Sequence, residues 1–196
     1  MSWTNPRFDY HGASVLVTGG SSGIGAGIAT AYREAGADVT ITGTRPRAAD
    51  YAADLAGLRY LQLQLEDDAG IERVAAALPR LDILVNNAGI VRDNSIFNMT
   101  VEDFDAVLKV HLRGTWIPCK HAAVHWRAIN KATGAKVDGR IINTVSGAGL
   151  TGNFGQTNYA PAKAAIASLT QTLSLELYKM GVTVNAVGPA AATRIT

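Results

Sequence analysis

The sequence predicts an α/β fold, a single domain built on a doubly wound parallel sheet. Short runs rich in Val, Ile and Leu alternate along the chain with longer segments of helical periodicity. The short runs are almost continuously apolar, which is typical of parallel strands that helices cover on both faces. With 196 residues, of which 47% are hydrophobic and 17% charged, the chain is long enough for one domain with a sizeable core, over residues 1–196.

Alternating strands and helices are expected along the whole chain. The predicted strands are SVLVTG (14–19), DVTITG (38–43), RYLQLQ (59–64), DILVNN (82–87), GRIINTV (139–145) and VTVNAV (182–187). The predicted helices are 24–35, 47–55, 68–77, 101–130 and 157–180. Thr100, with Asp103 three residues later, is a suitable N-terminal cap for the fourth helix. Gly36 and Gly181 stand where a glycine ends a helix before the next strand. This order implies right-handed crossovers between parallel strands.

A glycine-rich turn, VTGGSSGIG (17–25), follows the first strand and opens the first helix. Such a turn lets a pyrophosphate approach the free N–H groups and the positive dipole end of a helix. Glycines also end strands for purely structural reasons, but the position in the first β–α unit favours nucleotide binding and a Rossmann-type fold. The candidate contacts are Gly19, Ser21, Ser22, Gly23, Ile24 and Gly25.

The end of the second strand favours NADP as the cofactor. NAD-binding sites usually carry an acidic residue there, which accepts a hydrogen bond from the ribose 2′-OH. Here TITGTRPR (40–47) contains neither Asp nor Glu, and Arg45 follows the strand. An Arg can pair bidentately with a 2′-phosphate. We therefore favour NADP, keep NAD as the alternative, and expect Arg47 to be a solvated loop residue.

A tyrosine and a lysine lie one helical turn apart in YAPAK (159–163). Positions i and i+4 share a helix face, so the ammonium group of Lys163 can lower the pKa of the Tyr159 phenol from about 10. Ser146, just after the fifth strand, can polarise a substrate carbonyl oxygen. A Tyr and a Lys that share a helix face by coincidence are the alternative. With the glycine-rich turn present, we favour catalysis with Tyr159 as general acid/base.

Together, TGGSSGIG (18–25), NNAG (86–89), Ser146, Tyr159 and Lys163 resemble the short-chain dehydrogenase/reductase family, from about residue 12 to the C-terminus. The later segments are similar to the hydroxyacyl-CoA dehydrogenase unit of multifunctional enzymes and to bacterial 3-oxoacyl thioester reductases; these segments are VHLRGTW (110–116), GNFGQTNYAPAK (152–163) and GPAAATRIT (188–196).

The resemblance implies an oxidoreductase that transfers hydride between a nicotinamide cofactor and a small-molecule carbonyl or secondary alcohol. A 3-oxoacyl or 3-hydroxyacyl thioester is the favoured substrate. In such enzymes the lysine also holds the nicotinamide ribose, and the NNAG segment lines the adenosine side of the cofactor. The cofactor contacts implied in this way are Asn87, Ala88, Gly89, Tyr159, Lys163, Pro189 and Thr193.

The sequence departs from the family pattern at several positions. His111 replaces the usual catalytic Asn; we keep it as a candidate catalytic residue, with a helix-packing role as the alternative. Gln64 stands where many relatives carry an Asp that holds the adenine amino group, and its amide oxygen can accept the same bond. Pro161 requires that the last helix begin near Asn158 or be kinked there.

Relatives also continue beyond the TRIT region with a substrate-covering loop, a further helix and a seventh strand. We therefore expect six strands here, with the sixth as an exposed edge. A nucleotide-binding module without turnover, or a fragment, is the alternative function.

Composition limits the remaining possibilities. The net charge of +2 without a long basic run gives no sign of nucleic-acid or membrane-surface binding. Cys119 is the only cysteine, so no intramolecular disulfide can form, and a cytoplasmic location is expected. Cys119 and His121 are expected on helix faces, with no metal site. The wide apolar faces of the helices 101–130 and 157–180 predict a homodimer or homotetramer.

Overall fold

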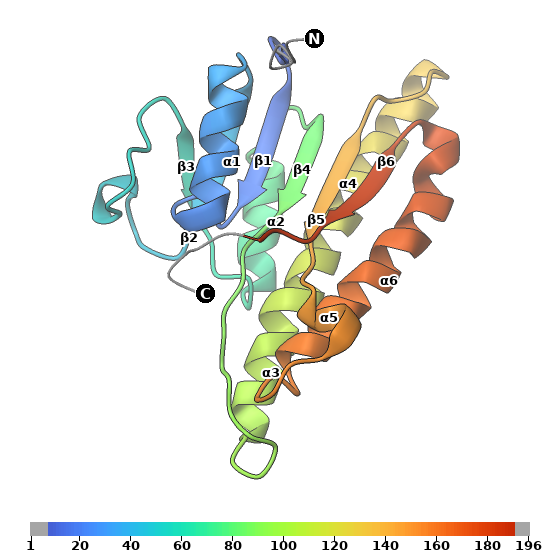
Figure 1. Ribbon diagram of the computed structural model, residues 1–196. Helices are drawn as coiled ribbons and strands as arrows, with labels where there is room; N and C mark the ends of the chain where they lie inside the picture. Colours follow the sequence, from blue (N-terminus) through green and yellow to red (C-terminus); the bar gives the residue numbers. More distant parts are fainter. Residues whose placement is uncertain (1–7, 191–196) are drawn as a thin grey trace, which may run out of the picture.

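A six-stranded parallel sheet forms the centre of the computed structural model, which describes residues 8–190 (Figure 1). Its strands are β1 (Ser14–Thr18), β2 (Asp38–Gly43), β3 (Arg59–Gln62), β4 (Ile83–Asn86), β5 (Arg140–Thr144) and β6 (Thr183–Val187). Their order is β3-β2-β1-β4-β5-β6, and every neighbouring pair is parallel. This order confirms the predicted Rossmann-type sheet, and the chain reverses direction across the sheet between β1 and β4.

The helices follow the predicted alternation except that one is added, one is divided and one is reduced to a short turn. They are α1 (Gly23–Glu34), α2 (Asp68–Ala76), α3 (Val101–Leu108), α4 (Gly114–Thr133), α5 (Ala148–Thr151) and α6 (Tyr159–Leu177). Three short helical turns accompany them: η1 (Ala48–Asp50), η2 (Lys109–Arg113) and η3 (Tyr178–Met180). The short helix α5 was not predicted. Gly36 and Gly181 have φ of 89° and 85° and end helical segments as expected.

Neighbouring residues of one strand serve two separate cores. Val15 and Val17 of β1 pack with α1 on one face of the sheet, whereas Leu16 packs with α2, α4 and α6 on the other. Figure 1 shows α1 on the near side of the sheet and α2 and α4 behind it. Because both faces are covered, each central strand must be apolar at successive positions, which explains the continuous apolar runs in the sequence.

The predicted helix 47–55 is wrong. Only η1 (Ala48–Asp50) is helical there, and residues 51–58 are irregular. The carboxylate of Asp50 accepts hydrogen bonds from the backbone N–H of Arg47 at 3.1 Å and from its guanidinium at 3.0 Å. The carboxylate of Asp54 accepts from the N–H of Ala56 at 3.0 Å. Such short-range bonds from Asp side chains to the backbone compete with helix formation.

The predicted helix 101–130 is present but interrupted. It begins as expected, because the Thr100 hydroxyl accepts a hydrogen bond from the N–H of Asp103 at 3.1 Å. Between α3 and α4 the chain makes one π-helical turn, η2, which contains His111. Pro118 follows within α4, and without an N–H it cannot bond the carbonyl group one turn before it. A π-helical turn within a longer helix, such as η2, often marks a functional site.

Apolar side chains remain exposed on the outer helices, among them Trp116 and Val124 on α4 and Leu175 on α6. The predicted association of two or more copies through these helices stays a prediction. In the described residues β6 pairs only with β5 and is an edge of the sheet. Over the same residues, no helix combines the length and the apolar character that a membrane crossing requires.

A chain of buried hydrogen bonds attaches α6 to the sheet. The amide nitrogen of Asn86 donates to the side-chain oxygen of Asn143 at 2.9 Å, and the amide nitrogen of Asn143 donates to the hydroxyl of Thr170 at 2.9 Å. The Thr170 hydroxyl donates in turn to the carbonyl of Ile166 at 2.8 Å. Asn143 is fully buried, so an unpaired amide there would carry its whole desolvation cost.

We expect Thr170→Val to lower the free energy of unfolding by about 1–3 kcal/mol, because it keeps the shape of the side chain but leaves the Asn143 amide without an acceptor. Thr172→Val is the matched control on the same helix, since its exposed hydroxyl makes a similar bond to a backbone carbonyl, at 3.2 Å. The control should change stability by less than about 0.5 kcal/mol. Urea unfolding of the three proteins checks this, and equal losses in both variants would contradict a special role for Thr170.

Candidate active site

The predicted site residues gather at one edge of the sheet, where all six parallel strands end. In an open α/β sheet this edge is where ligands bind. Gly19 follows β1, Arg45 follows β2, Gln64 follows β3, Asn87 follows β4, Ser146 follows β5 and Pro189 follows β6. Thr193, the remaining predicted contact, lies outside the described residues.

The glycine-rich turn packs tightly against the loop after β4. Gly19 has φ of +65°, and a Cβ atom there would lie 2.7 Å from the Cα of Ala88. A Cβ on Gly25 would collide with the carbonyl oxygen of Gly19. Ser21 is buried, and Ser22 precedes α1 without capping it by its side chain. The first N–H groups of α1, at Gly23 and Ile24, are thus suited to bind an anion.

Thr18, which the sequence reasoning missed, joins the glycine-rich turn to the NNAG segment. Its hydroxyl accepts hydrogen bonds from the backbone N–H groups of Asn87 at 3.0 Å and Ala88 at 3.3 Å. The amide of Asn87 donates to the carbonyl of Gly19 at 3.3 Å. Asn87 and Ala88 therefore shape the wall of the turn. A buried Thr at a strand end gives no distinctive sequence signal.

Helix α6 begins directly at the candidate catalytic tyrosine. The side chain of Asn158 accepts from the N–H of Tyr159 at 2.7 Å and donates to the carbonyl of Arg92 at 2.8 Å. Pro161 is the third residue of α6, within the first turn, where an N–H has no helical partner to lose. The prediction that the helix starts near Asn158 is confirmed. Asn158 itself, fully buried, was missed as the residue that positions Tyr159.

Tyr159 and Lys163 lie on one face of α6, with the Lys163 nitrogen 5.6 Å from the centre of the Tyr159 ring. The Lys163 ammonium donates to the carbonyl of Thr144 at 2.6 Å. Lys163 is only 4% exposed, and its burial lowers its pKa to about 8. Ser146 follows Thr144 after two residues and is half-buried at the same strand end.

The expected lowering of the Tyr159 pKa by Lys163 does not occur in the chain alone. Burial raises the pKa of Tyr159, a hydrogen bond with Ser146 opposes this, and the negative charge of Asp93 adds to the rise. The expectation was wrong because it considered only charge. The Lys163 ammonium is directed to the Thr144 carbonyl, and the same burial that reduces its own charge also disfavours a phenolate.

His111 lies in the π-helical turn with its ring edge-to-face against Tyr159, 5.1 Å between ring centres. Its Nε2 lies 2.8 Å from the carbonyl oxygen and 3.2 Å from the N–H of Ile90, and Gly89 lies against the ring. Burial, and then the charge of Lys163, lower the His111 pKa to about 4, although the bond to Ile90 raises it. The imidazole is therefore neutral at physiological pH and holds the loop after β4.

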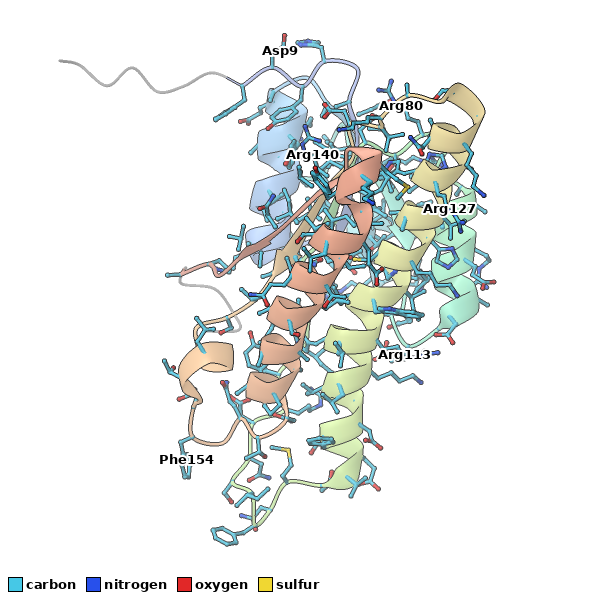
Figure 2. The ribbon with its side chains drawn as sticks, turned by 90° about the vertical axis from the view of Figure 1, so that its right-hand side faces the viewer. Asp9, Arg80, Arg113, Arg127, Arg140 and Phe154 are labelled. Atoms are coloured by element: carbon cyan, nitrogen blue, oxygen red, sulfur yellow. The ribbon has the colours of Figure 1, made fainter. Side chains whose placement is uncertain are left out.

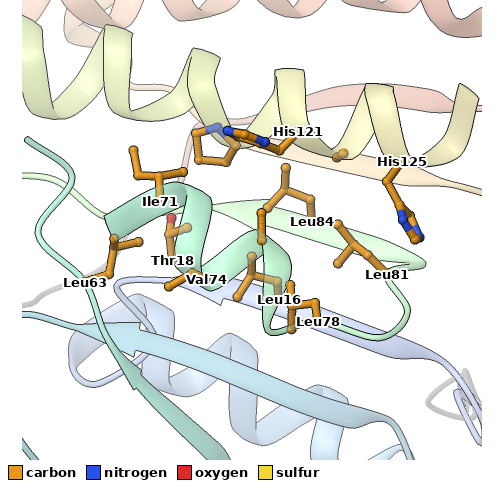
Figure 3. A pocket seen from close by; sticks show the side chains of 13 residues that line it. Leu16, Thr18, Leu63, Ile71, Val74, Leu78, Leu81, Leu84, His121 and His125 are labelled. Atoms are coloured by element: carbon orange, nitrogen blue, oxygen red, sulfur yellow. The ribbon is translucent and has the colours of Figure 1, made fainter. Parts of the chain in front are cut away.

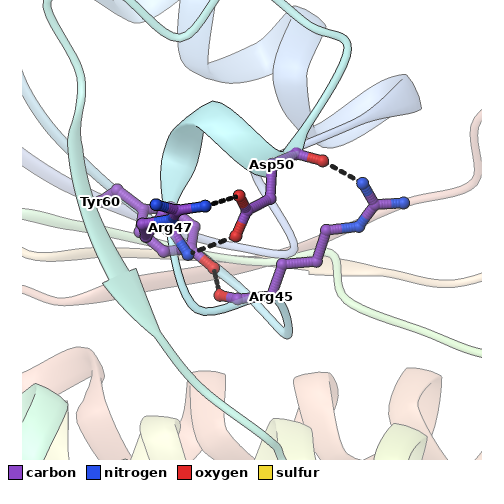
Figure 4. A network of polar contacts seen from close by, with 4 residues as sticks. All are labelled: Arg45, Arg47, Asp50 and Tyr60. Atoms are coloured by element: carbon purple, nitrogen blue, oxygen red, sulfur yellow. Dashed lines mark hydrogen bonds and ion pairs between the residues drawn. The ribbon is translucent and has the colours of Figure 1, made fainter.

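Arg45 lies at the end of β2 but is held within its own loop (Figure 4). Its guanidinium donates to the carbonyl of Asp50 and lies 5.0 Å from the centre of the Tyr51 ring, and its own carbonyl accepts from the Tyr60 hydroxyl. Arg47 pairs with the Asp50 carboxylate at 3.0 Å and is largely exposed, as expected. The amide of Gln64 donates to the carbonyl of Thr44 at 3.4 Å, so Gln64 stays at the same sheet edge.

A separate cavity of about 50 Å³ lies between α2, α4 and the sheet (Figure 3). Its lining is mostly apolar, and His121 and His125 reach it from α4, but none of the predicted site residues lines it. Cys119 is buried nearby with its sulfur 3.2 Å from the Asn86 amide, and burial raises its pKa to about 12. Within residues 8–190, no three His, Cys, Asp or Glu side chains are grouped as metal ligands.

Comparisons with known proteins agree with this architecture. The family model for short chain dehydrogenases matches residues 13–195. Hydroxyacyl-CoA dehydrogenase ChsB1 of Mycobacterium tuberculosis is 38% identical over 98% of this chain, which spans 65% of that protein's length. The 3-oxoacyl-[acyl-carrier-protein] reductase FabG of Escherichia coli is 37% identical over 92% of the chain, which spans 74% of its length.

A peroxisomal hydratase-dehydrogenase-epimerase of Neurospora crassa is 37% identical over 97% of this chain, and the chain spans 22% of its length. Among solved structures, a short chain dehydrogenase from Mycobacterium avium superposes with a TM-score of 0.82 at 42% identity, covering 95% of this chain and 70% of that one. The matched family model, these relatives and the strand order together show that the chain belongs to the short-chain dehydrogenase/reductase family.

Proposed function

We propose that the protein is an NADP(H)-dependent oxidoreductase that transfers hydride between the nicotinamide and a ketone or secondary alcohol. A 3-oxoacyl or 3-hydroxyacyl thioester is the proposed substrate. The observation that carries the proposal is the convergence of the glycine-rich turn, Ser146, Tyr159 and Lys163 at one edge of the sheet. The residues fit the cofactor, because the space beside Gly23 at the N-terminus of α1 is open and no acidic residue lies in the first turn of that helix.

The bound cofactor supplies or accepts the hydride. Ser146 donates a hydrogen bond to the substrate oxygen, and Tyr159 donates its proton as that oxygen gains negative charge. The raised pKa of Tyr159 keeps the phenol protonated at neutral pH, which is the form that carbonyl reduction requires. Lys163 holds the ribose and restores the proton to Tyr159. His111 keeps the loop after β4 in place through Ile90.

Two surface loops support an acyl substrate. Ile96 and Phe97 lie in the loop after β4, Leu150 lies in α5 and Phe154 follows it, and their exposures range from 63% to 92%. The two loops are joined by a hydrogen bond from the N–H of Asn94 to the carbonyl of Gly155 at 2.8 Å, close to the start of α6. Figure 2 shows Phe154 directed outward below α5. Apolar side chains on both loops suit an apolar acyl chain.

Arg45→Ala should raise the Kd for NADPH by about 10- to 100-fold, because a hydrogen-bonded arginine–phosphate pair is worth about 1.5–3 kcal/mol. The Kd for NADH should change by less than about threefold. Arg47→Ala is the matched control, since Arg47 comes from the same loop but pairs with Asp50. Fluorescence titration with both cofactors measures this, and equal losses for NADPH and NADH would contradict the proposed 2′-phosphate contact.

Tyr159→Phe should abolish reduction of a 3-oxoacyl thioester by at least about 100-fold in kcat, because the substrate oxygen loses its proton donor. The Kd for NADPH should stay within about threefold. The matched control is Tyr178→Phe, an exposed tyrosine beyond the end of α6, which should leave both quantities unchanged. If Tyr159→Phe instead loses cofactor binding, Tyr159 has a structural role.

Lys163 should make the folded chain more stable as the pH rises from 8 to 10.5. Its pKa is 10.5 in the unfolded chain and about 8 in the folded one, so the unfolded chain binds more protons between these values. The unfolding free energy of the wild type, relative to Lys163→Met, should therefore rise by about 3 kcal/mol from pH 8 to pH 10.5. Denaturant unfolding across this range checks it. A flat difference would show that Lys163 is not desolvated in the folded chain.

A further inference from the structure

The strand end that usually selects between NAD and NADP carries no side chain in this protein. In dinucleotide-binding folds, an acidic residue about 20 residues beyond the first glycine holds the ribose 2′-OH. Here β2 ends at Gly43, at the sheet edge next to the glycine-rich turn. The choice between a 2′-OH and a 2′-phosphate must therefore depend on groups other than a side chain at position 43.

Two hydroxyl groups occupy the space that a side chain at position 43 would fill. A Cβ atom on Gly43 would lie 2.5 Å from the hydroxyl oxygen of Tyr51 and 2.6 Å from the Oγ of Ser21. Ser21 belongs to the glycine-rich turn and was predicted as a cofactor contact. Tyr51 lies eight residues beyond Gly43 in sequence and was predicted to lie in a helix. Its hydroxyl thus stands in the position of the missing carboxylate.

The irregular loop after η1 holds Tyr51 in this position. The Tyr51 hydroxyl accepts a hydrogen bond from the backbone N–H of Arg45 at 2.9 Å, and the Tyr51 ring packs against Tyr60, 5.9 Å between ring centres. Burial opposes ionisation of Tyr51, but hydrogen bonding outweighs it, with the N–H of Arg45 as the largest contributor, and lowers its pKa to about 8. The Tyr51 oxygen therefore lies beside the N–H of Arg45 and the hydroxyl of Ser21, two donor groups that also suit an anion.

We propose that the Tyr51 hydroxyl contacts the 2′ substituent of the adenine ribose, in place of the carboxylate absent from the end of β2. This inference rests on the proposed function, because it assumes that the dinucleotide binds at this sheet edge. A phenol can donate a hydrogen bond to a 2′-phosphate, which a carboxylate would repel. The guanidinium of Arg45, which lies over the Tyr51 ring, supplies the positive charge beside it.

The test uses the full chain and two probes that differ only in the 2′ substituent, adenosine 2′,5′-bisphosphate and adenosine 5′-monophosphate. Tyr51→Phe should weaken binding of the bisphosphate about tenfold, because a hydrogen bond to a charged group is lost. The Kd for the monophosphate should change by less than about threefold. Tyr60→Phe is the matched control: it removes a hydroxyl from the same cluster that donates to the carbonyl of Arg45, and the ratio of the two Kd values should stay within about twofold.

Calorimetric titration separates the outcomes. An unchanged ratio of the two Kd values in Tyr51→Phe, whether both probes weaken equally or neither does, overturns the inference and leaves the proposed function intact. Failure of the wild type to bind either probe overturns the proposed cofactor site and the inference with it. The double variant Gly43→Asp/Tyr51→Ala moves a carboxylate back to the strand end, and should bind the monophosphate more tightly than the bisphosphate. A double variant that still prefers the bisphosphate also overturns the inference.

Discussion

The buried hydrogen bonds from Asn86 through Asn143 to Thr170 determine where helix α6 lies on the sheet. Asn86 and Asn143 are register partners on β4 and β5, and both side chains are shielded from water, so their amide N–H groups must find acceptors inside the protein. Thr170 supplies the last acceptor from α6. Lys163 lies two turns before Thr170 on the same helix face, so the contact that satisfies the amides also directs Lys163 toward the sheet edge.

A second set of hydrogen bonds holds the loops around that edge, where the backbone is irregular and cannot satisfy itself. Thr18 accepts from two N–H groups of the NNAG segment, and Asn158 connects the start of α6 to the loop after β4. His111 contributes through Ile90. Each of these side chains is at least partly shielded and reaches from a regular element to a loop, so the geometry of the loops depends on the rigid sheet.

The parts of the structure that were predicted correctly are those specified by local pattern. Continuous apolar strands, the glycine-rich turn, the cap at Thr100 and the first-turn position of Pro161 depend on residues close in sequence. The helix at 47–55 failed because Asp50 binds the nearby backbone instead of leaving it to a helix. The bond from Lys163 to Thr144, the position of Tyr51 over Gly43 and the role of Thr18 depend on contacts between distant segments or across a loop, for which the sequence carries no periodic signal.

The protonation states of the site follow from burial more than from pairing. Desolvation disfavours every charged form, so it lowers the pKa values of Lys163 and His111 and raises that of Tyr159. In the chain alone these shifts favour a protonated phenol and a neutral imidazole, and weaken the charge on the lysine. In the proposed reaction the hydroxyls of Ser146 and Tyr159 would be the two hydrogen-bond donors to the ketone oxygen, and neither carries a net charge to desolvate. The same desolvation makes a lone phenolate costly, so the proposed oxidation of an alcohol would need a positive charge beside Tyr159, and Lys163, with a pKa of about 8, is still mostly protonated at neutral pH.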